Sequence, residues 1–251
     1  MDFTRDSTQT TVAEMVDGLI AREPADLWAA LSDAGLSTML LPEAAGGDGL
    51  GIPEAAVVLT ELAKHAAVGP ALATIGFGIV PLTALAGPEV IARIAQPGAI
   101  LTAALAEPRS PFPLDPATKA VPDGDRMRVT GTKIAVAYAE QAHRILVPTS
   151  EGVVLVDPKA DGVTCTRTPS STGEPEYVVE MDDAPGEFVS LDTARLYRLA
   201  VAAIGAVADG LAAGAAELTA THLANRHQFG KPLATFQAVA GEIADVYVTA
   251  R

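Results

Sequence analysis

One short stretch of the sequence gathers residues that could hold an anionic cofactor. Residues 226–233 read Arg-His-Gln-Phe-Gly-Lys-Pro-Leu. A guanidinium can bind a pyrophosphate through two parallel hydrogen bonds, so Arg226 is a candidate for such a contact. A solvated cation at a helix end is the alternative interpretation of Arg226. Phe229 fits a core position equally well, and a core role and a binding role are compatible.

Other candidate sites lack the residues or the spacing that their chemistry needs. His222 and His227 do not stack on one helix face, so no metal site is expected. The run from Gly46 to Gly51 lacks both the GxGxxG spacing and the βαβ context of a dinucleotide fingerprint, and a surface turn is the default interpretation. A hydrolase triad has no support, because no recognisable base partner accompanies Ser110, Ser170 or Ser171.

The composition of the chain excludes several kinds of binding partner and site. The 251 residues are 49% hydrophobic, and 31 acidic against 17 basic residues give a net charge of −14. Such a field repels polyanions, so nucleic acid is excluded as an expected partner, although a few local arginines can still bind one small anion. Cys165 is the only cysteine, which excludes an internal disulfide framework and a cysteine-based zinc site. This cysteine usage fits a reducing cytoplasm.

No targeting or membrane-spanning segment is predicted. Asp2, Arg5 and Asp6 stand where a secretory signal needs a basic head and an apolar run. The most apolar region, from Val68 to Ala86, is interrupted by three glycines and two prolines. A span needs about 20 mostly apolar residues, so one or two short buried helices are the better interpretation of this region.

Residues 1–97 are expected to form an N-terminal helical domain. Apolar stripes with helical spacing occupy residues 12–20, 27–34 and 55–66. Gly35 is expected to end the second of these helices, and Pro53 sits in the first turn of the third.

In residues 98–190 the apolar residues no longer have helical spacing. These residues are expected to form a small β-barrel or sandwich. Turn-forming residues at 122–125, at Glu151-Gly152 and at Ala184-Pro185-Gly186 separate short runs rich in β-branched residues. This punctuation favours a barrel or sandwich over βαβ units. The runs are 129–131, 134–138, 145–147, 153–156 and 177–179.

Residues 191–251 are expected to be the partial start of a C-terminal helical domain, which makes the predicted fold α+β. Asp192 is a good N-cap for a long alanine-rich helix that runs to about Ala224. Another helix is expected after Pro232, and its apolar stripe from Phe236 to Tyr247 needs a partner to bury it. Either the stripe docks on the long helix and on other subunits, or the natural chain continues.

Two stretches in the first two domains resemble the acyl-CoA dehydrogenase family. Residues 41–51, Leu-Pro-Glu followed by a glycine-rich run, resemble the family's N-terminal loop, with Glu61-Leu62-Ala63 in the helix behind it. Glu107-Pro108 and residues 129–133, Val-Thr-Gly-Thr-Lys, resemble the β-domain strands that hold the flavin ring.

A third stretch is the most specific, and with it the resemblance covers essentially the whole chain. Residues 226–233, with Phe236-Gln237, resemble the helix junction that reaches the flavin of a neighbouring subunit. The resemblance implies an acyl-CoA thioester as substrate, from which a glutamate removes the α-proton while a hydride passes from the β-carbon to the flavin. The FAD-binding residues that it implies are Arg226, Gln228, Phe229 and Gln237.

The sequence departs from the family pattern where the flavin ring would lie. The family's glycine- and serine-rich turn after Glu-Pro is replaced by residues 109–113, whose two prolines have no N–H to donate. Ala106 replaces the usual hydroxyl residue before that pair. An ungapped alignment puts Ala135 and Ala137 where the family has Trp and Thr beside the ring. Tyr138 would approach the ring only if the register shifted.

No catalytic base can be named. The family's glutamate lies in the last helices or, in a minority, at the position of Ala194, which cannot take a proton. Glu217 and Glu242 fit surface or structural roles. The chain therefore resembles the flavin-depleted subunit of actinobacterial heteromeric acyl-CoA dehydrogenases, which often act on steroid side-chain thioesters. The resemblance implies FAD shared with a second dehydrogenase-like subunit in a hetero-oligomer, or with further copies in a homo-oligomer.

Two rival interpretations stay open. The chain could be an enzyme whose unusual flavin bed becomes complete when further C-terminal helices are counted. It could instead be a non-enzymatic interaction subunit that retains only the fold.

Overall fold

The N-terminal helices begin where short-range signals in the sequence predict them. Asp6 caps the first helix, because its carboxylate accepts a hydrogen bond from the backbone N–H of Gln9. Asp26 caps the second helix in the same way, and Pro53 stands in the first turn of the third. These helices are α1 (Ser7–Ile20), α2 (Leu27–Asp33) and α3 (Ile52–Lys64), with the 3-10 turn η1 (Glu43–Ala45) before α3.

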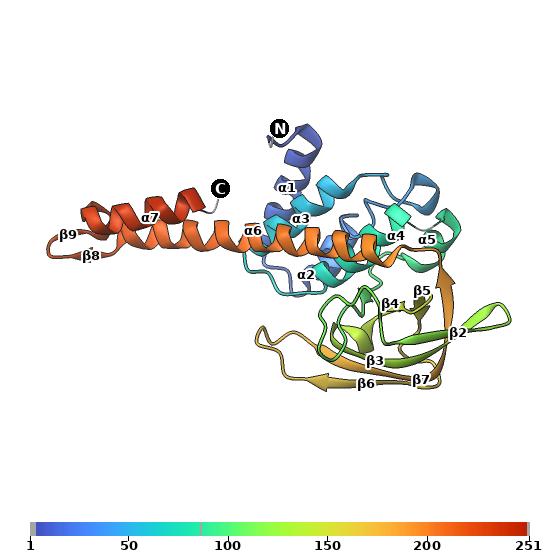
Figure 1. Cartoon of the computed structure of the whole chain (residues 1–251). Helices are drawn as coiled ribbons and strands as arrows, with labels where there is room; N and C mark the ends of the chain where they lie inside the picture. Colours follow the sequence, from blue (N-terminus) through green and yellow to red (C-terminus); the bar gives the residue numbers. More distant parts are fainter. Residues whose placement is uncertain (1–3, 86, 250–251) are drawn as a thin grey trace.

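The computed structural model places a helical layer beside a β-sheet, and one long helix runs past both (Figure 1). It describes residues 4–85 and 87–249. Asp2 and Ala86 lie outside the described residues.

The apolar region after α3 folds into buried helical turns, as the sequence predicts. The π-helix η2 (Leu72–Ile79) continues into α4 (Val80–Leu85), and α5 (Pro88–Ile94) follows. Glycine is required for this packing, since a Cβ on Gly78 would stand 2.5 Å from the Cβ of Leu101.

Seven strands form one mixed sheet in the middle of the chain. Their order is β1-β4-β5-β7-β3-β2, with β6 paired to β7; β1 runs parallel to β4 and the other pairs are antiparallel. Among the described residues the sheet is open at β1 and β2, so the α+β architecture is confirmed but the sheet is not a closed barrel. The strands are β1 (Leu101–Ala103), β2 (Lys119–Asp123), β3 (Arg126–Ala137), β4 (Arg144–Thr149), β5 (Gly152–Val156), β6 (Val163–Thr168) and β7 (Glu176–Val189).

The two longest strands differ from the boundaries that the sequence suggests. The runs 129–131 and 134–138 belong almost entirely to one strand, β3, which bends at a bulge where Ala135 has a φ of 53°. The turn predicted at Ala184-Pro185-Gly186 is wrong, because these residues lie inside β7. The bend occurs just before them, at Asp183 with a φ of 53°, where β7 passes from pairing with β6 to pairing with β5.

Apolar residues are buried on both faces of the sheet. Successive side chains of β5 point to opposite faces and contribute to both. Val153 and Leu155 pack against the helices, whereas Val154 and Val156 pack into a second apolar cluster on the opposite face. The helical and β parts therefore share one core cluster. The domain limits 1–97, 98–190 and 191–251 stay predictions.

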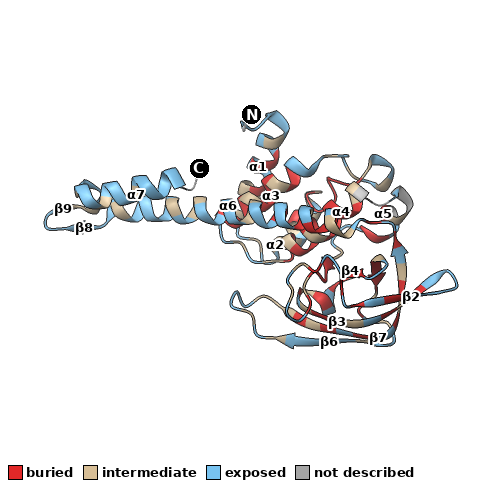
Figure 2. Ribbon diagram, in the orientation of Figure 1, coloured by how far each residue is buried: buried red, intermediate tan, exposed pale blue. Residues whose placement is uncertain are grey.

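The last part of the chain forms an arm that extends away from the body (Figure 1). Asp192 caps α6 (Thr193–Asn225) by accepting a hydrogen bond from the N–H of Arg195 at 2.6 Å, which confirms the predicted start. A hairpin of β8 (His227–Gln228) and β9 (Lys231–Pro232) reverses the chain. The 3-10 turn η4 (Leu233–Thr235) intervenes, so α7 (Gln237–Thr249) begins later than predicted. Most of the arm is exposed (Figure 2).

By length and composition, α6 is the one helix in the described part of the chain that could cross a membrane. Within the chain, only 17% of its most apolar 18-residue window is buried. One such helix is a weak sign of a span, because a long core helix passes the same test.

Candidate functional site

The four residues predicted to contact FAD lie at the far end of the arm, residues 226–237, which we call the tip. Arg226 directly follows α6, Gln228 lies in β8, Phe229 is in the turn, and Gln237 begins α7. The N–H of Leu233 donates to the carbonyl oxygen of Arg226 at 2.8 Å, and β8 pairs with β9. Backbone hydrogen bonds thus order the tip and leave the side chains available.

Aromatic contacts complete the turn at the tip. Phe229 has a φ of 53° and is 93% exposed, so it does not occupy the core position that the sequence also allows. Its ring lies 6.2 Å from that of Phe236 in an edge-on arrangement, and the Lys231 ammonium lies 4.3 Å above the Phe236 ring. A left-handed conformation is uncommon for a residue other than glycine, and such outliers gather at functional sites.

The tip is the positive part of an acidic chain. No Asp or Glu occurs between Leu218 and Gly241, although the net charge of the whole chain is −14. Among the described residues, the side chains of Arg226, Gln228 and Gln237 have no hydrogen-bond or ion-pair partner. A guanidinium and amides without partners suit a diphosphate, because each can donate hydrogen bonds to phosphate oxygens.

The family pattern places the flavin ring beside the loop of residues 106–113. In this chain, contacts with other parts of the chain hold that loop in place. The N–H of Ile134 donates to the carbonyl oxygen of Ala106 at 3.0 Å. Phe112 packs edge-on against Tyr197 of α6, with ring centres 5.4 Å apart. The Tyr197 hydroxyl donates to the carbonyl oxygen of Pro113 at 3.0 Å. These contacts tie the loop to β3 and to the first turns of α6.

Three of the positions beside the expected ring position offer it no free side-chain donor. Ala135 and Ala137 carry no polar side-chain atom, and the Tyr138 hydroxyl already donates to Glu174 at 2.9 Å. Burial and this hydrogen bond both raise the pKa of Tyr138. Glu174 also accepts from the N–H of Gly69 at 3.1 Å, so it links the β-sheet to the helical layer. These residues do not fit an isoalloxazine ring.

A buried ion pair lies under the same loop, and the sequence analysis did not predict it. The Lys133 ammonium donates to Glu107 at 2.8 Å, and both side chains are buried. Glu107 also accepts hydrogen bonds from the Thr118 hydroxyl and from the N–H groups of Ala117 and Thr118. Burial acts to raise the pKa of Glu107, but these hydrogen bonds outweigh it and the pKa falls to about 2. The Glu-Pro and Gly-x-Lys motifs were the available signal for this pair.

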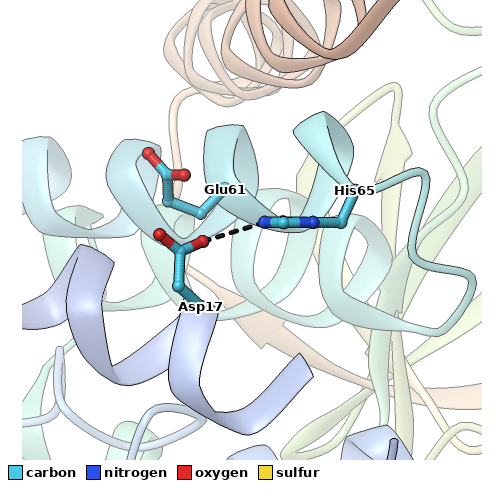
Figure 3. A group of neighbouring side chains, drawn as sticks. All are labelled: Asp17, Glu61 and His65. Atoms are coloured by element: carbon cyan, nitrogen blue, oxygen red, sulfur yellow. Dashed lines mark hydrogen bonds and ion pairs between the residues drawn. The ribbon is translucent and has the colours of Figure 1, made fainter. Parts of the chain in front are cut away.

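A second group of charged side chains joins α1 to α3 (Figure 3). Asp17, Glu61 and His65 each offer a ligand atom within 4.8 Å of the others. His65 contacts Asp17 at 2.9 Å, and Arg5 forms an ion pair with Glu61. A guanidinium beside Glu61 opposes a bound cation, and Asp17 and Glu61 each already have a partner within the chain. We assign no metal to it.

The structure does not add a catalytic base. Ala194 lies in the first turn of α6, and Glu217 pairs with Lys64 at 3.5 Å, which agrees with a structural role for Glu217. The base stays unassigned.

Comparison with known proteins identifies the family. Residues 1–97 match the acyl-CoA dehydrogenase N-terminal domain and residues 193–251 match the C-terminal domain. The whole chain is 46% identical to the acyl-CoA dehydrogenase FadE28 of Mycobacterium tuberculosis and covers 74% of that protein. The chain belongs to the acyl-CoA dehydrogenase family. FadE27 of the same organism is 31% identical over 93% of this chain, which spans 65% of FadE27.

Solved structures agree with this assignment. The ChsE4–ChsE5 complex from M. tuberculosis matches all of the chain with a TM-score of 0.87 and 28% identity, over 76% of the matched chain. A variant of the Tcur3481–Tcur3483 steroid ACAD matches 96% of the chain with a TM-score of 0.84 and 32% identity, over 72% of its own chain. The family resemblance and the class of FAD-dependent oxidoreductase predicted from the sequence are thereby confirmed.

Proposed function

We propose that this chain is an acyl-CoA dehydrogenase subunit that completes a flavin site seated mainly on another dehydrogenase-like chain. One contrast carries the proposal: Arg226 at the tip is free, whereas Tyr138 and Phe112 are engaged within the chain. Bound FAD supplies the hydride acceptor for dehydrogenation between the α- and β-carbons of an acyl-CoA thioester. This chain supplies the Arg226 contact to the diphosphate, with Gln228, Phe229 and Gln237 around it.

Two relatives support a partner chain and a substrate class. One matched structure is described as a complex of ChsE4 with ChsE5, and another as a Tcur3481–Tcur3483 steroid ACAD. We therefore propose a second acyl-CoA dehydrogenase-like subunit as the partner and a steroid side-chain thioester as the substrate class. We place the assembly in the cytoplasm, where the unpaired Cys165 fits a reducing compartment.

Substitution of Arg226 tests the proposed contact. Arg226→Ala removes a charge-assisted hydrogen bond, which is worth roughly 1.5–3 kcal/mol, so flavin affinity of the assembly should fall about 10- to 100-fold. Flavin content is measured by absorbance after gel filtration of the complex with its partner. Arg226→Lys should retain part of the affinity, because it keeps the charge but loses the paired donors.

The control is Lys159→Ala, which removes an exposed cation from the β-domain. This variant should retain flavin as the unmodified chain does. Equal flavin content in the Arg226→Ala and Lys159→Ala complexes would show that Arg226 does not bind the flavin and is a solvated cation. An assembly that never carries flavin would favour the interaction-subunit interpretation.

A further inference from the structure

A polar cleft lies between α5 and the end of the sheet where β7 approaches the helical layer (Figure 1). Its volume is about 660 Å³, which is within the range of sites for small metabolites. None of the described residues that line it belongs to the tip or to the loop of residues 106–113. Its charged side chains are Arg93, Asp125, Arg126, Arg144, Asp157 and Glu187.

Strand pairing brings four of these side chains to one face of the sheet. Leu155 packs against the helices, so Asp157, two positions along β5, points the same way, and so does Glu187, which pairs with Leu155. The register of β4 with β5 sets Arg144 beside Asp157. One step beyond the last pair of β3 with β7, Arg126 stands beside Glu187. The order of charges across β4, β5, β7 and β3 is therefore positive, negative, negative, positive.

Two of the three carboxylates that line the cleft are already paired with guanidinium groups. Arg144 donates to one oxygen of Asp157 at 3.2 Å, and the other oxygen accepts from the N–H of Lys159 at 2.9 Å. Glu187 forms an ion pair with Arg93. A guanidinium carries five N–H donors, and among the described residues each of these two arginines donates from one nitrogen only. The unused N–H groups can bind an anion in the cleft.

Arg126 adds a guanidinium whose donors are all unused. Its side chain has no hydrogen bond or ion pair within the described part of the chain, and neither has that of Asp125 beside it. The free acceptors in the cleft are Asp125 and the second oxygen of Glu187, so the unused donors outnumber them. A matching ligand is rich in acceptors and also carries a few hydroxyl groups that can donate.

We propose that this cleft binds a small phosphate monoester that carries hydroxyl groups. The phosphate contacts Arg126 and the N–H groups that Arg93 and Arg144 leave unused, because guanidinium groups bind phosphate through paired hydrogen bonds. A phosphate offers three acceptor oxygens where a carboxylate offers two, which suits three guanidinium groups. The hydroxyl groups donate to Asp125. Binding requires neither flavin nor a second subunit, so the inference stands or fails separately from the shared flavin site.

Isothermal titration calorimetry of the full chain with ribose 5-phosphate tests the proposal. The dissociation constant should be below about 1 mM, and inorganic phosphate should bind at least about tenfold more weakly, because it has no sugar hydroxyls to donate. Ribose, which lacks the anionic group, should give no measurable heat. A dissociation constant above about 1 mM for ribose 5-phosphate overturns the proposal, and so does tighter binding of citrate, a carboxylate probe.

Substitution of Arg126 locates the phosphate. Arg126→Ala should weaken the binding of ribose 5-phosphate about 10- to 100-fold, as expected for the loss of a hydrogen bond to a charged group. Its circular dichroism should stay unchanged, because the side chain has no partner to lose. The matched control is Arg226→Ala, which removes the unpartnered guanidinium at the tip and should leave the affinity unchanged. Equal losses in the two variants, or a loss in the control alone, overturn the proposal.

Substitution of Asp125 separates the two halves of the ligand. Asp125→Ala removes an acceptor and a negative charge, so it should weaken the binding of ribose 5-phosphate while inorganic phosphate binds as tightly as before or more tightly. The same calorimetry measures both. An Asp125→Ala variant that weakens both ligands equally, or neither, would overturn the contact between the hydroxyl groups and Asp125 and with it the proposed ligand.

Discussion

The tip of the arm and the loop that contains Phe112 are the two regions that the family pattern places beside a flavin, and they satisfy their polar groups in opposite ways. At the tip, Arg226 and Gln228 have no partner among the described residues, and Phe229 is 93% exposed. Under the loop, Glu107 is buried and accepts four hydrogen bonds.

Burial explains this difference between the two regions. An unpaired polar group costs little in water and a great deal in a protein interior, so only the exposed tip can keep free donors for a ligand. Changes in the buried loop should therefore reduce stability, whereas changes at the tip should reduce binding and leave stability intact.

Removal of the buried cation should give the largest effect. Lys133→Met leaves the Glu107 charge buried without its partner, and breaking such a pair costs about 3–5 kcal/mol of unfolding free energy. Urea denaturation measures this loss. The control is Lys133→Met/Glu107→Leu, which removes both charges and should recover most of the stability. A single variant that loses under about 1 kcal/mol would mean that the pair does not hold the loop.

Stability should depend on pH through Glu107. Its pKa is lowered from 4.5 to about 2 in the folded chain, so the carboxylate stabilises the fold above pH 4.5. That contribution, of about 3 kcal/mol, should be lost as the pH falls from 4.5 toward 2. Glu107→Gln should be less stable at neutral pH and should lose less stability in acid. Parallel pH profiles for the two proteins would contradict the assignment.

The link between the loop and α6 should contribute less. Tyr197→Phe keeps the ring contact with Phe112 and removes the hydrogen bond to Pro113, so unfolding free energy should fall by about 1 kcal/mol. Flavin content of the assembled complex should not change. A variant that loses flavin while retaining full stability would place Tyr197 in the binding site and not in the loop closure.

A substitution at the tip should hardly change the stability of the chain. Phe229→Ala removes a side chain that is 93% exposed, and the free energy of unfolding should change by under about 0.5 kcal/mol. Flavin retention by the complex should nevertheless fall. A drop of more than about 1 kcal/mol in the stability of the chain alone would show that the tip is a packing feature.

The parts of the fold that local signals specify could be predicted from the sequence. Asp192 as a helix cap and Pro53 in a first turn mark ends that depend on neighbouring residues only. The turn expected at Ala184-Pro185-Gly186 failed because cross-strand packing decides that region. Gly186 fits there because a Cβ would stand 2.4 Å from Val154. Strand β6 is half exposed and rich in threonine, and its apolar alternation is limited to Val163 and Cys165, which was too short to detect.

The candidate site could be predicted only where its residues lie close together in the sequence. The tip residues from Arg226 to Phe229 stand together in the sequence, so their motif was visible. Lys133 and Glu107 lie 26 positions apart, and only the pairing of β3 with the loop brings them into contact.

The flavin content of the chain, with and without a partner, tests the central claim most directly. The chain purified alone should be colourless, because Ala135 and Ala137 offer the ring no side-chain donor and the Tyr138 hydroxyl already donates to Glu174. Co-expression with a second dehydrogenase-like subunit should give flavin absorbance and acyl-CoA-dependent dye reduction. Stoichiometric FAD and turnover by the chain alone would contradict the account of a subunit that completes a site on its partner.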